Sequence, residues 1–133
     1  MSQKSSKIII FDGFWKVSDV EKYPNALFIY GDNDAGIGKK GQAVIRGLPN
    51  TAGIPTKKYP SNHPKSFYTD EEYLINKQRI RNAINNIIER SMDYKYVVLP
   101  EDGFGTGLAK LPTMASKTYQ FLVKEIEKLK TLI

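Results

Sequence analysis

The chain contains no cysteine and only one histidine. The lack of cysteine excludes disulfide bonds, thiolate zinc sites and cysteine nucleophiles. With His63 as the one imidazole, the chain offers neither a Ser/His/Asp set nor an HExxH zinc motif. We expect no metal and no cofactor. A chain without cysteine also fits a reducing compartment, so we expect a cytoplasmic location.

Long apolar runs, internal repeats and low-complexity linkers are missing as well. Residues 1–6 are polar and expected to be flexible, and the apolar run that follows covers only residues 8–11. The sequence therefore predicts neither a signal peptide nor a membrane span. With 133 residues, the chain is predicted to form a single domain, residues 1–133, with its own hydrophobic core.

Blocks of like charge are also absent, although the net charge is +6 and the pI about 9.4. The basic residues are dispersed along the sequence. Such a balance serves general solubility, a small ligand that carries phosphate, or a nucleic acid, and we rank these three in that order.

Hydrophobic patterning predicts strands that alternate with helices. Strands are expected at residues 7–11, 26–30, 51–55 and 95–99, and helices at residues 18–23, 41–46, 70–92 and 113–129. This alternation indicates an α/β fold with a largely parallel sheet. Pro55 argues against a central position for the third strand, and the first strand is expected to be buried.

Helix ends carry recognisable signals. Ser18 is the expected N-cap of the first helix, and Thr69 with Glu72 forms the pattern of a capping box before the long helix at 70–92. The last helix is expected to follow Pro112 and to place one apolar face on the core. That face comprises Tyr119, Leu122, Val123, Ile126 and Leu129.

The first of two glycine-bearing loops follows the second strand. Gly31, Asp32 and Asn33 end that strand, and residues 36–41 bring three glycines together with Lys39 and Lys40. Glycine lets backbone N–H groups approach a phosphate closely, although the same glycines also suit a tight turn. Asp32 and Asn33 could hold ribose hydroxyls or an adenine edge, or they could form an Asx-turn.

The second loop follows the fourth strand and reads Glu101, Asp102, then residues 103–107. Two adjacent carboxylates repel each other when shielded from water, so one of them is expected to serve a ligand or a cation, unless one caps the loop and the other is solvated. Phe104 lies between two glycines and is the candidate for stacking on a ring. Thr106 and its flanking glycines could wrap a diphosphate.

Three segments are predicted to meet at one edge of the sheet, because parallel strands end together. They are residues 32–33, 57–58 and 101–106. Such an edge is the usual place for a ligand in an α/β fold.

These motifs resemble those of the macro domain, an α/β family that binds ADP-ribose. The segments 31–33 and 38–45 match its Asn-containing strand end and glycine-rich stretch, and Pro100 to Leu111 is similar to its second glycine-rich loop. The segment Gly53-Ile54-Pro55-Thr56-Lys57 resembles a stretch of uncharacterised, often phage-encoded, macro-like proteins. The resemblance covers residues 26–126 and implies a three-layer sandwich with a mostly parallel or mixed central sheet.

The resemblance implies a cleft for ADP-ribose or a related nucleotide diphosphate. Asn33 would contact the distal ribose, the two glycine loops the pyrophosphate, and Phe104 a ring or sugar face. The chain departs from the family at Lys39 and Lys40, which interrupt the glycine run, and at Glu101 and Asp102, where one branch has Arg and Ile. It also carries Ala109 where that branch places a catalytic Asp.

The sequence thus leaves three functions to compare: a reader or sequestering protein for ADP-ribose-like ligands or ADP-ribosylated macromolecules, an ADP-ribosyl hydrolase, and a nucleic-acid binder. Candidate catalytic residues are Asn33, Asp32 and Asp102. The expected ligand-binding residues are Gly31, Asp32, Asn33, Gly38, Lys39, Gly41, Gln42, Lys57, Glu101, Asp102, Gly103, Phe104, Gly105, Thr106 and Gly107.

Overall fold

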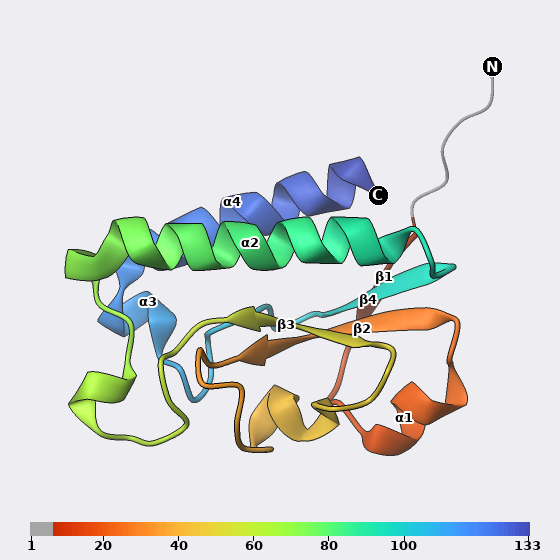
Figure 1. The fold of residues 1–133 in the computed structure, drawn as a ribbon, viewed down its shortest axis with the longest axis horizontal. Helices are drawn as coiled ribbons and strands as arrows, with labels where there is room; N and C mark the ends of the chain where they lie inside the picture. Colours follow the sequence, from red (N-terminus) through yellow and green to blue (C-terminus); the bar gives the residue numbers. More distant parts are fainter. Residues whose placement is uncertain (1–6) are drawn as a thin grey trace.

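The computed structural model describes residues 7–133, which form one sheet flanked by helices (Figure 1). The expected flexibility of residues 1–6 lies outside the described residues. The four strands are β1 (Ile8–Phe11), β2 (Ala26–Asp32), β3 (Thr51–Pro55) and β4 (Tyr96–Pro100). Every pairing is parallel, in the order β1-β4-β2-β3. The predicted α/β class, the parallel sheet and the edge position of β3 are therefore confirmed.

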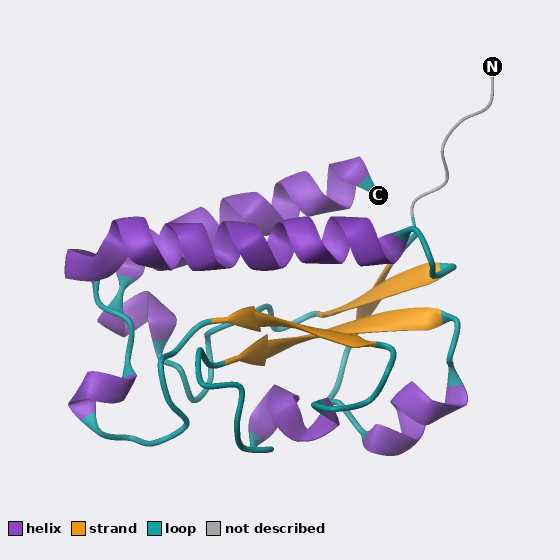
Figure 2. Cartoon of the chain, in the orientation of Figure 1, coloured by secondary structure: helices purple, strands orange, loops and turns teal. Residues whose placement is uncertain are grey.

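Helices cover both faces of the sheet, as Figure 2 shows. The long helices α2 (Tyr73–Ser91) and α4 (Ser116–Leu132) lie on one face, while α1 (Val17–Lys22) and the 3-10 helix η1 (Gly41–Ile45) lie on the other. Shorter helical turns are η2 (Pro64–Ser66), η3 (Asp70–Glu72) and α3 (Leu111–Met114). This arrangement is compatible with a three-layer α/β fold.

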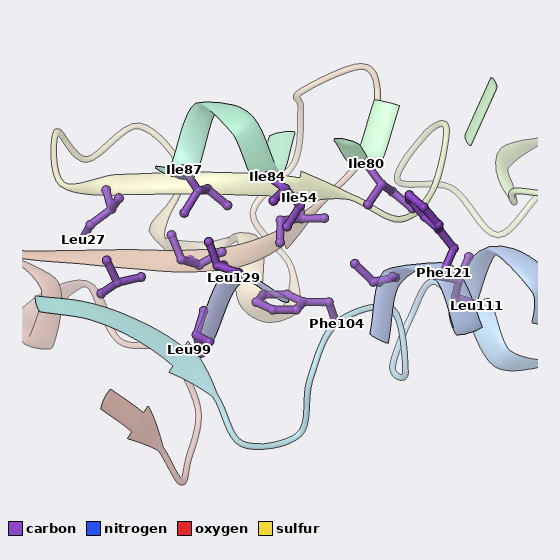
Figure 3. Packing of buried hydrophobic residues seen from close by; sticks show 14 of the residues in the cluster. Leu27, Ile54, Ile80, Ile84, Ile87, Leu99, Phe104, Leu111, Phe121 and Leu129 are labelled. Atoms are coloured by element: carbon purple, nitrogen blue, oxygen red, sulfur yellow. The ribbon is translucent and has the colours of Figure 1, made fainter. Parts of the chain in front are cut away.

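Two hydrophobic clusters hold the layers together. The larger one lies between the sheet and the helices α2 and α4, where Ile80, Ile84 and Ile87 form the apolar stripe of α2 (Figure 3). The smaller one, on the opposite face, includes Trp15, which donates from Nε1 to the carbonyl of Ile29 at 3.0 Å. Because both faces of the central strands are covered, β2 and β4 read as continuous apolar runs.

The prediction of a buried first strand is wrong. Ile9 and Ile10 are 41% and 48% exposed, because β1 lies at the edge of the sheet and pairs only with β4. A short apolar run has the same appearance in an edge strand and in a central one.

The predicted caps differ from the structure. Lys16, not Ser18, is the N-cap of α1, and it makes no side-chain cap bond. Thr69 forms no capping box: its hydroxyl donates to the Glu72 carboxylate at 3.3 Å, and the first turn is the 3-10 helix η3. The side-chain pairing replaces the reciprocal backbone bonds of a capping box.

The last predicted helix is divided in two. Ala115, with φ of −152° and ψ of 71°, lies outside the helical region and separates α3 from α4, and Pro112 lies in the first turn of α3. Val123 does not belong to the inner face, because it is 42% exposed. The other predicted residues of that face are buried or packed against the larger cluster. No helix among residues 7–133 combines the length and apolarity that crossing a bilayer requires.

Candidate functional site

A cavity of about 610 Å³ opens at the carboxyl edge of the sheet. Loops that follow all four strands contribute to its walls, so the predicted convergence at this edge is confirmed. Its volume falls within the range of small-molecule sites. The cavity brings together most of the predicted ligand-binding residues: Gly31, Asp32, Asn33, Gly38, Lys39, Gly41, Gln42, Lys57, Asp102, Gly105, Thr106 and Gly107.

The Asn33 side chain shapes the first loop. Its Nδ2 donates to the carbonyl of Ile37 at 2.8 Å, and its Oδ1 accepts from the N–H of Ile37 at 3.4 Å. The side chain at the start of the loop therefore closes it with bonds to the backbone four residues on, rather than the two of the Asx-turn that the sequence left open. These bonds occupy the amide that the sequence assigned to the distal ribose.

The Asp32 carboxylate is paired within the protein. Its Oδ1 lies 2.5 Å from a guanidinium nitrogen of Arg46 and accepts the N–H of Asn33 at 2.7 Å. The side chains of Asp32 and Arg46 are 17% and 15% exposed, so the pair is largely shielded from water. Burial and the Asp32 charge raise the pKa of the adjacent Tyr30. Asp32 thus anchors Arg46 under the first loop.

Gln42 links the two glycine loops. Its Oε1 accepts the N–H of Gly31 at 2.7 Å, and its Nε2 donates to the carbonyl of Gly103 at 2.9 Å. One side chain thus joins the end of β2 to the loop after β4. The position of Gln42 was predicted to bind ligand, whereas its geometry is that of a strut between the cavity walls.

Unpaired backbone N–H groups line the cavity on both sides. Within residues 7–133, no hydrogen bond uses the N–H groups of Gly38, Lys39 or Gly41 on one side, nor those of Gly105 to Ala109 on the other. Gly38, Gly41 and Gly105 have φ between 61° and 85°, which turns successive N–H groups toward one side of the chain. Concavities of this kind bind anions.

Three predicted residues of the second loop lie outside the cavity lining: Phe104, Glu101 and Gly103. Phe104 is 3% exposed and belongs to the core, so the predicted stacking role is wrong. Gly103 and Gly105, with φ of 76° and 77°, reverse the chain on either side of Phe104 and turn its ring inward (Figure 3). The loop is thereby fastened to the core by an aromatic anchor.

Glu101 and Asp102 have separate surroundings. Asp102 is exposed and lines the cavity. Glu101 faces Asp12, whose negative charge raises the pKa of Glu101 more than Asp102 does. The expected repulsion within the adjacent pair is thus secondary, and only Asp102 is positioned to meet a ligand.

An apolar rim was not predicted from the sequence. Phe14 is 88% exposed, Leu108 56% and Ile37 54%, and all three line the cavity. Trp15 is 5% exposed and packs in the smaller cluster, and it also contributes to the cavity lining. The aromatic density of residues 11–15 directly after a strand was the available signal.

Lys57 is the buried cation of the site. It is 5% exposed, lines the cavity, and holds its Nζ 4.6 Å from the centre of the Phe67 ring. Burial lowers the pKa of Lys57, and the charge of Lys110 lowers it further. By contrast, the neighbouring Lys58 pairs with Glu72. The part of the chain that the structure describes holds no group of three or more His, Cys, Asp or Glu side chains arranged for a metal ion.

Comparison with known proteins gives one family match. A search of curated proteins and a search of solved structures returned no match to the chain. The model of a family of unknown function (DUF7831) matches residues 10–125, which include every strand end and every loop that lines the cavity. The chain therefore belongs to this family of unknown function, DUF7831.

Proposed function

We propose that the cavity binds ADP-ribose or a related nucleotide diphosphate, and that the protein acts as a reader or sequestering protein with a macro domain-like fold. The observation that carries the proposal is the pair of glycine-bearing loops that line one cavity at the carboxyl edge of a parallel sheet and hold backbone N–H groups without a hydrogen-bond partner within residues 7–133. Backbone donors of this kind suit a diphosphate. A cysteine-free chain supports placing this function in the cytoplasm.

The apolar rim supports a ligand that carries a base. The Phe14 side chain is 88% exposed, so a nucleobase that covers its ring displaces few existing protein contacts and gains stacking energy. We assign this role to Phe14 in place of Phe104. Base stacking on an aromatic residue contributes about 1–3 kcal/mol, so Phe14→Ala is expected to weaken binding by about 5- to 150-fold.

Binding without turnover is the version that the geometry favours. Asp32 is paired with Arg46, and the amide of Asn33 is bound to the backbone of Ile37. Of the three candidate catalytic side chains, only Asp102 makes no hydrogen bond or ion pair within residues 7–133. A hydrolase needs a polarising group and an activated water in reach of one another, and a single exposed carboxylate supplies one of the two.

Nucleic-acid binding receives less support. Lys58 and Arg79 pair with carboxylates, and Lys77 and Arg81 lie over the ring of Phe121. Side chains engaged in this way do not present a continuous basic surface. A separate titration with a single-stranded oligonucleotide at several salt concentrations tests this function, because binding would fall steeply with salt if several phosphates were neutralised.

The experiment is a thermal-shift panel of ADP-ribose, cyclic ADP-ribose isomers, NAD and cyclic dinucleotides, followed by titration of any active compound. A ligand at one hundred times its Kd stabilises the fold by about 2.7 kcal/mol. For a chain of this length the melting temperature rises about 3.6 °C per kcal/mol, which predicts a shift of about 10 °C. Trp15, the single tryptophan, lies in the cavity wall and gives a fluorescence readout of the same event.

The blocking variant must fill the cavity without disturbing the fold. Gly105 is unsuitable, because a Cβ there would lie 2.9 Å from Leu111. Gly107 lines the cavity, and a Cβ there meets no atom within 4 Å. Gly107→Val should remove the ligand shift and keep the melting temperature of the free protein, whereas Leu74→Ala, at a 77% exposed position outside the cavity lining, should change neither. No shift with any compound at millimolar concentration would refute the proposal.

A further inference from the structure

Lys57 is a buried cation without a counter-charge. Its exposure is 5%, and its Nζ forms no hydrogen bond or ion pair with any residue in the range 7–133. Buried charges in proteins are normally paired, because an isolated ammonium loses its hydration without compensation. The face of the Phe67 ring, 4.6 Å away, offsets part of that loss. The Nζ atom is not among the fully enclosed polar atoms without a partner in residues 7–133, so it keeps access to the cavity, where an anion can take the place of water.

A second cation is held beside the first. The Nζ of Lys110 lies 5.9 Å from the centre of the same Phe67 ring. Lys110 has φ of 48° and is the one non-glycine residue with positive φ among residues 7–133. A lysine in this left-handed conformation carries backbone strain, and such strain gathers at functional sites. The structure thus holds two like charges around one ring at a cost in both backbone and electrostatic energy.

The position of Lys57 gives the cavity two different ends. Lys57 follows β3, the strand at one edge of the sheet, while Phe14 follows β1 at the other edge. Three strand spacings separate these edges, which is about 14 Å. The loops with free N–H groups follow β2 and β4, the two strands between them. An extended ligand would therefore meet an aromatic rim, a backbone cradle and a lysine pair in that order.

We propose that Lys57 binds a terminal phosphate group at the end of the cavity away from Phe14, and that Lys110, beside the same Phe67 ring but outside the cavity lining, adds a second positive charge. A phosphate monoester carries close to two negative charges at neutral pH and so matches two lysines better than a carboxylate does. The hydroxyl-bearing Ser61 also lines the cavity. This inference rests on the function proposed above and narrows it to a nucleotide diphosphate with a free terminal phosphate, a group that ADP-ribose lacks, whereas the phosphate pocket can be tested without the rest of the ligand.

The test measures the affinity of inorganic phosphate by Trp15 fluorescence at constant ionic strength. Lys57→Met keeps the aliphatic stem over Phe67 and removes the charge, and Lys110→Asn removes the second charge with a residue that tolerates positive φ. Each is expected to weaken phosphate binding about tenfold or more. Lys95→Met removes one charge from an exposed position outside the cavity lining and should leave the Kd within about twofold of wild type.

A pH profile separates a charge contact from a structural effect. Sulfate is the probe, because its charge does not change in this range. The lowered pKa of Lys57 arises from burial and from Lys110, so sulfate affinity should fall as pH rises and Lys57 becomes neutral. In Lys57→Met this fall should disappear, while the folded protein should be as stable as wild type or more so.

The outcomes distinguish this inference from the proposed function. If phosphate binding depends on Lys57 but no nucleotide gives a response, the phosphate pocket is supported and the nucleotide proposal is refuted. Nucleotide binding together with a phosphate Kd that Lys57→Met leaves unchanged would refute the pocket and leave the nucleotide proposal. Equal losses in Lys57→Met and Lys95→Met would show a general charge effect and would also refute the pocket.

Discussion

Gln42 offers the sharpest test of how the cavity is built. Its side chain satisfies the N–H of Gly31 at 2.7 Å and the carbonyl of Gly103 at 2.9 Å, and all three residues are only partly exposed. Gln42→Ala removes both bonds and leaves two backbone groups to find water. At about 1 kcal/mol for each lost bond, we expect a loss of about 2 kcal/mol in the free energy of unfolding. The melting temperature should then fall by about 7 °C.

A second substitution tests the donor alone. Gln42→Glu keeps an acceptor for the N–H of Gly31 but places a carboxylate oxygen against the carbonyl of Gly103. A protonated carboxyl at this position can donate to the carbonyl of Gly103 again, so the pKa of that carboxyl should be higher in the folded protein than in the unfolded chain. The variant is therefore expected to approach the stability of wild type at low pH and to lose stability as pH rises.

Urea unfolding of the three proteins at several pH values is the assay. Gln78→Ala is the control, because Gln78 is exposed on α2 and bonds only to Asn82, so its removal should change stability by less than about 0.5 kcal/mol. If Gln42→Ala unfolds within the same margin, Gln42 does not hold the two loops together. If Gln42→Glu shows no pH dependence beyond that of wild type, the bond to Gly103 is absent in solution.

Three further predictions concern the surroundings of the cavity. Asn50 is 7% exposed and donates from Nδ2 to three backbone carbonyls, so Asn50→Ala should lower the free energy of unfolding by about 2–3 kcal/mol. Denaturant unfolding measures this loss, and Asn50→Ser should recover part of it. Gly53→Ala would place a Cβ 2.9 Å from the Cβ of Asp32, so it should lower stability by about 1–3 kcal/mol and weaken ligand binding; an unchanged melting temperature would contradict this packing. The hydrogen bond and charge of Lys58 lower the pKa of Glu72, so this pair should stabilise the fold above the ordinary Glu range and lose its effect as pH falls through the lowered pKa; Glu72→Gln should flatten that part of the stability profile.

Much of the architecture could be predicted because local signals and fold agree. Thr51 to Pro55 has the predicted bounds of β3, since a short strand between turn residues ends at a proline on the sheet edge. The isoleucines of α2 recur at intervals of three and four residues, and this periodicity matches the buried face of the helix. The alternation of strands and helices was enough to predict that the two loops meet at the carboxyl edge of the sheet.

The details of the site depend on contacts that no local pattern contains. Phe104 turns inward because its two flanking glycines have positive φ angles. Glycine adopts φ of either sign, so the sequence does not reveal this direction. Gln42 meets Gly103 across 61 residues of sequence. The burial of Lys57 depends on the later Phe67, and the exposure of Phe14 on how the loop after β1 leaves the sheet.

The most direct test of the central claim is titration of the 133-residue chain with ADP-ribose, in wild type and in Gly107→Val, with Trp15 fluorescence and calorimetry as the readouts. We predict saturable one-to-one binding to wild type that is weakened at least about tenfold in the variant, with equal melting temperatures for the two free proteins. Binding that is unchanged in Gly107→Val would place the ligand elsewhere. No binding to wild type at millimolar ADP-ribose or any other nucleotide of the panel would contradict the account.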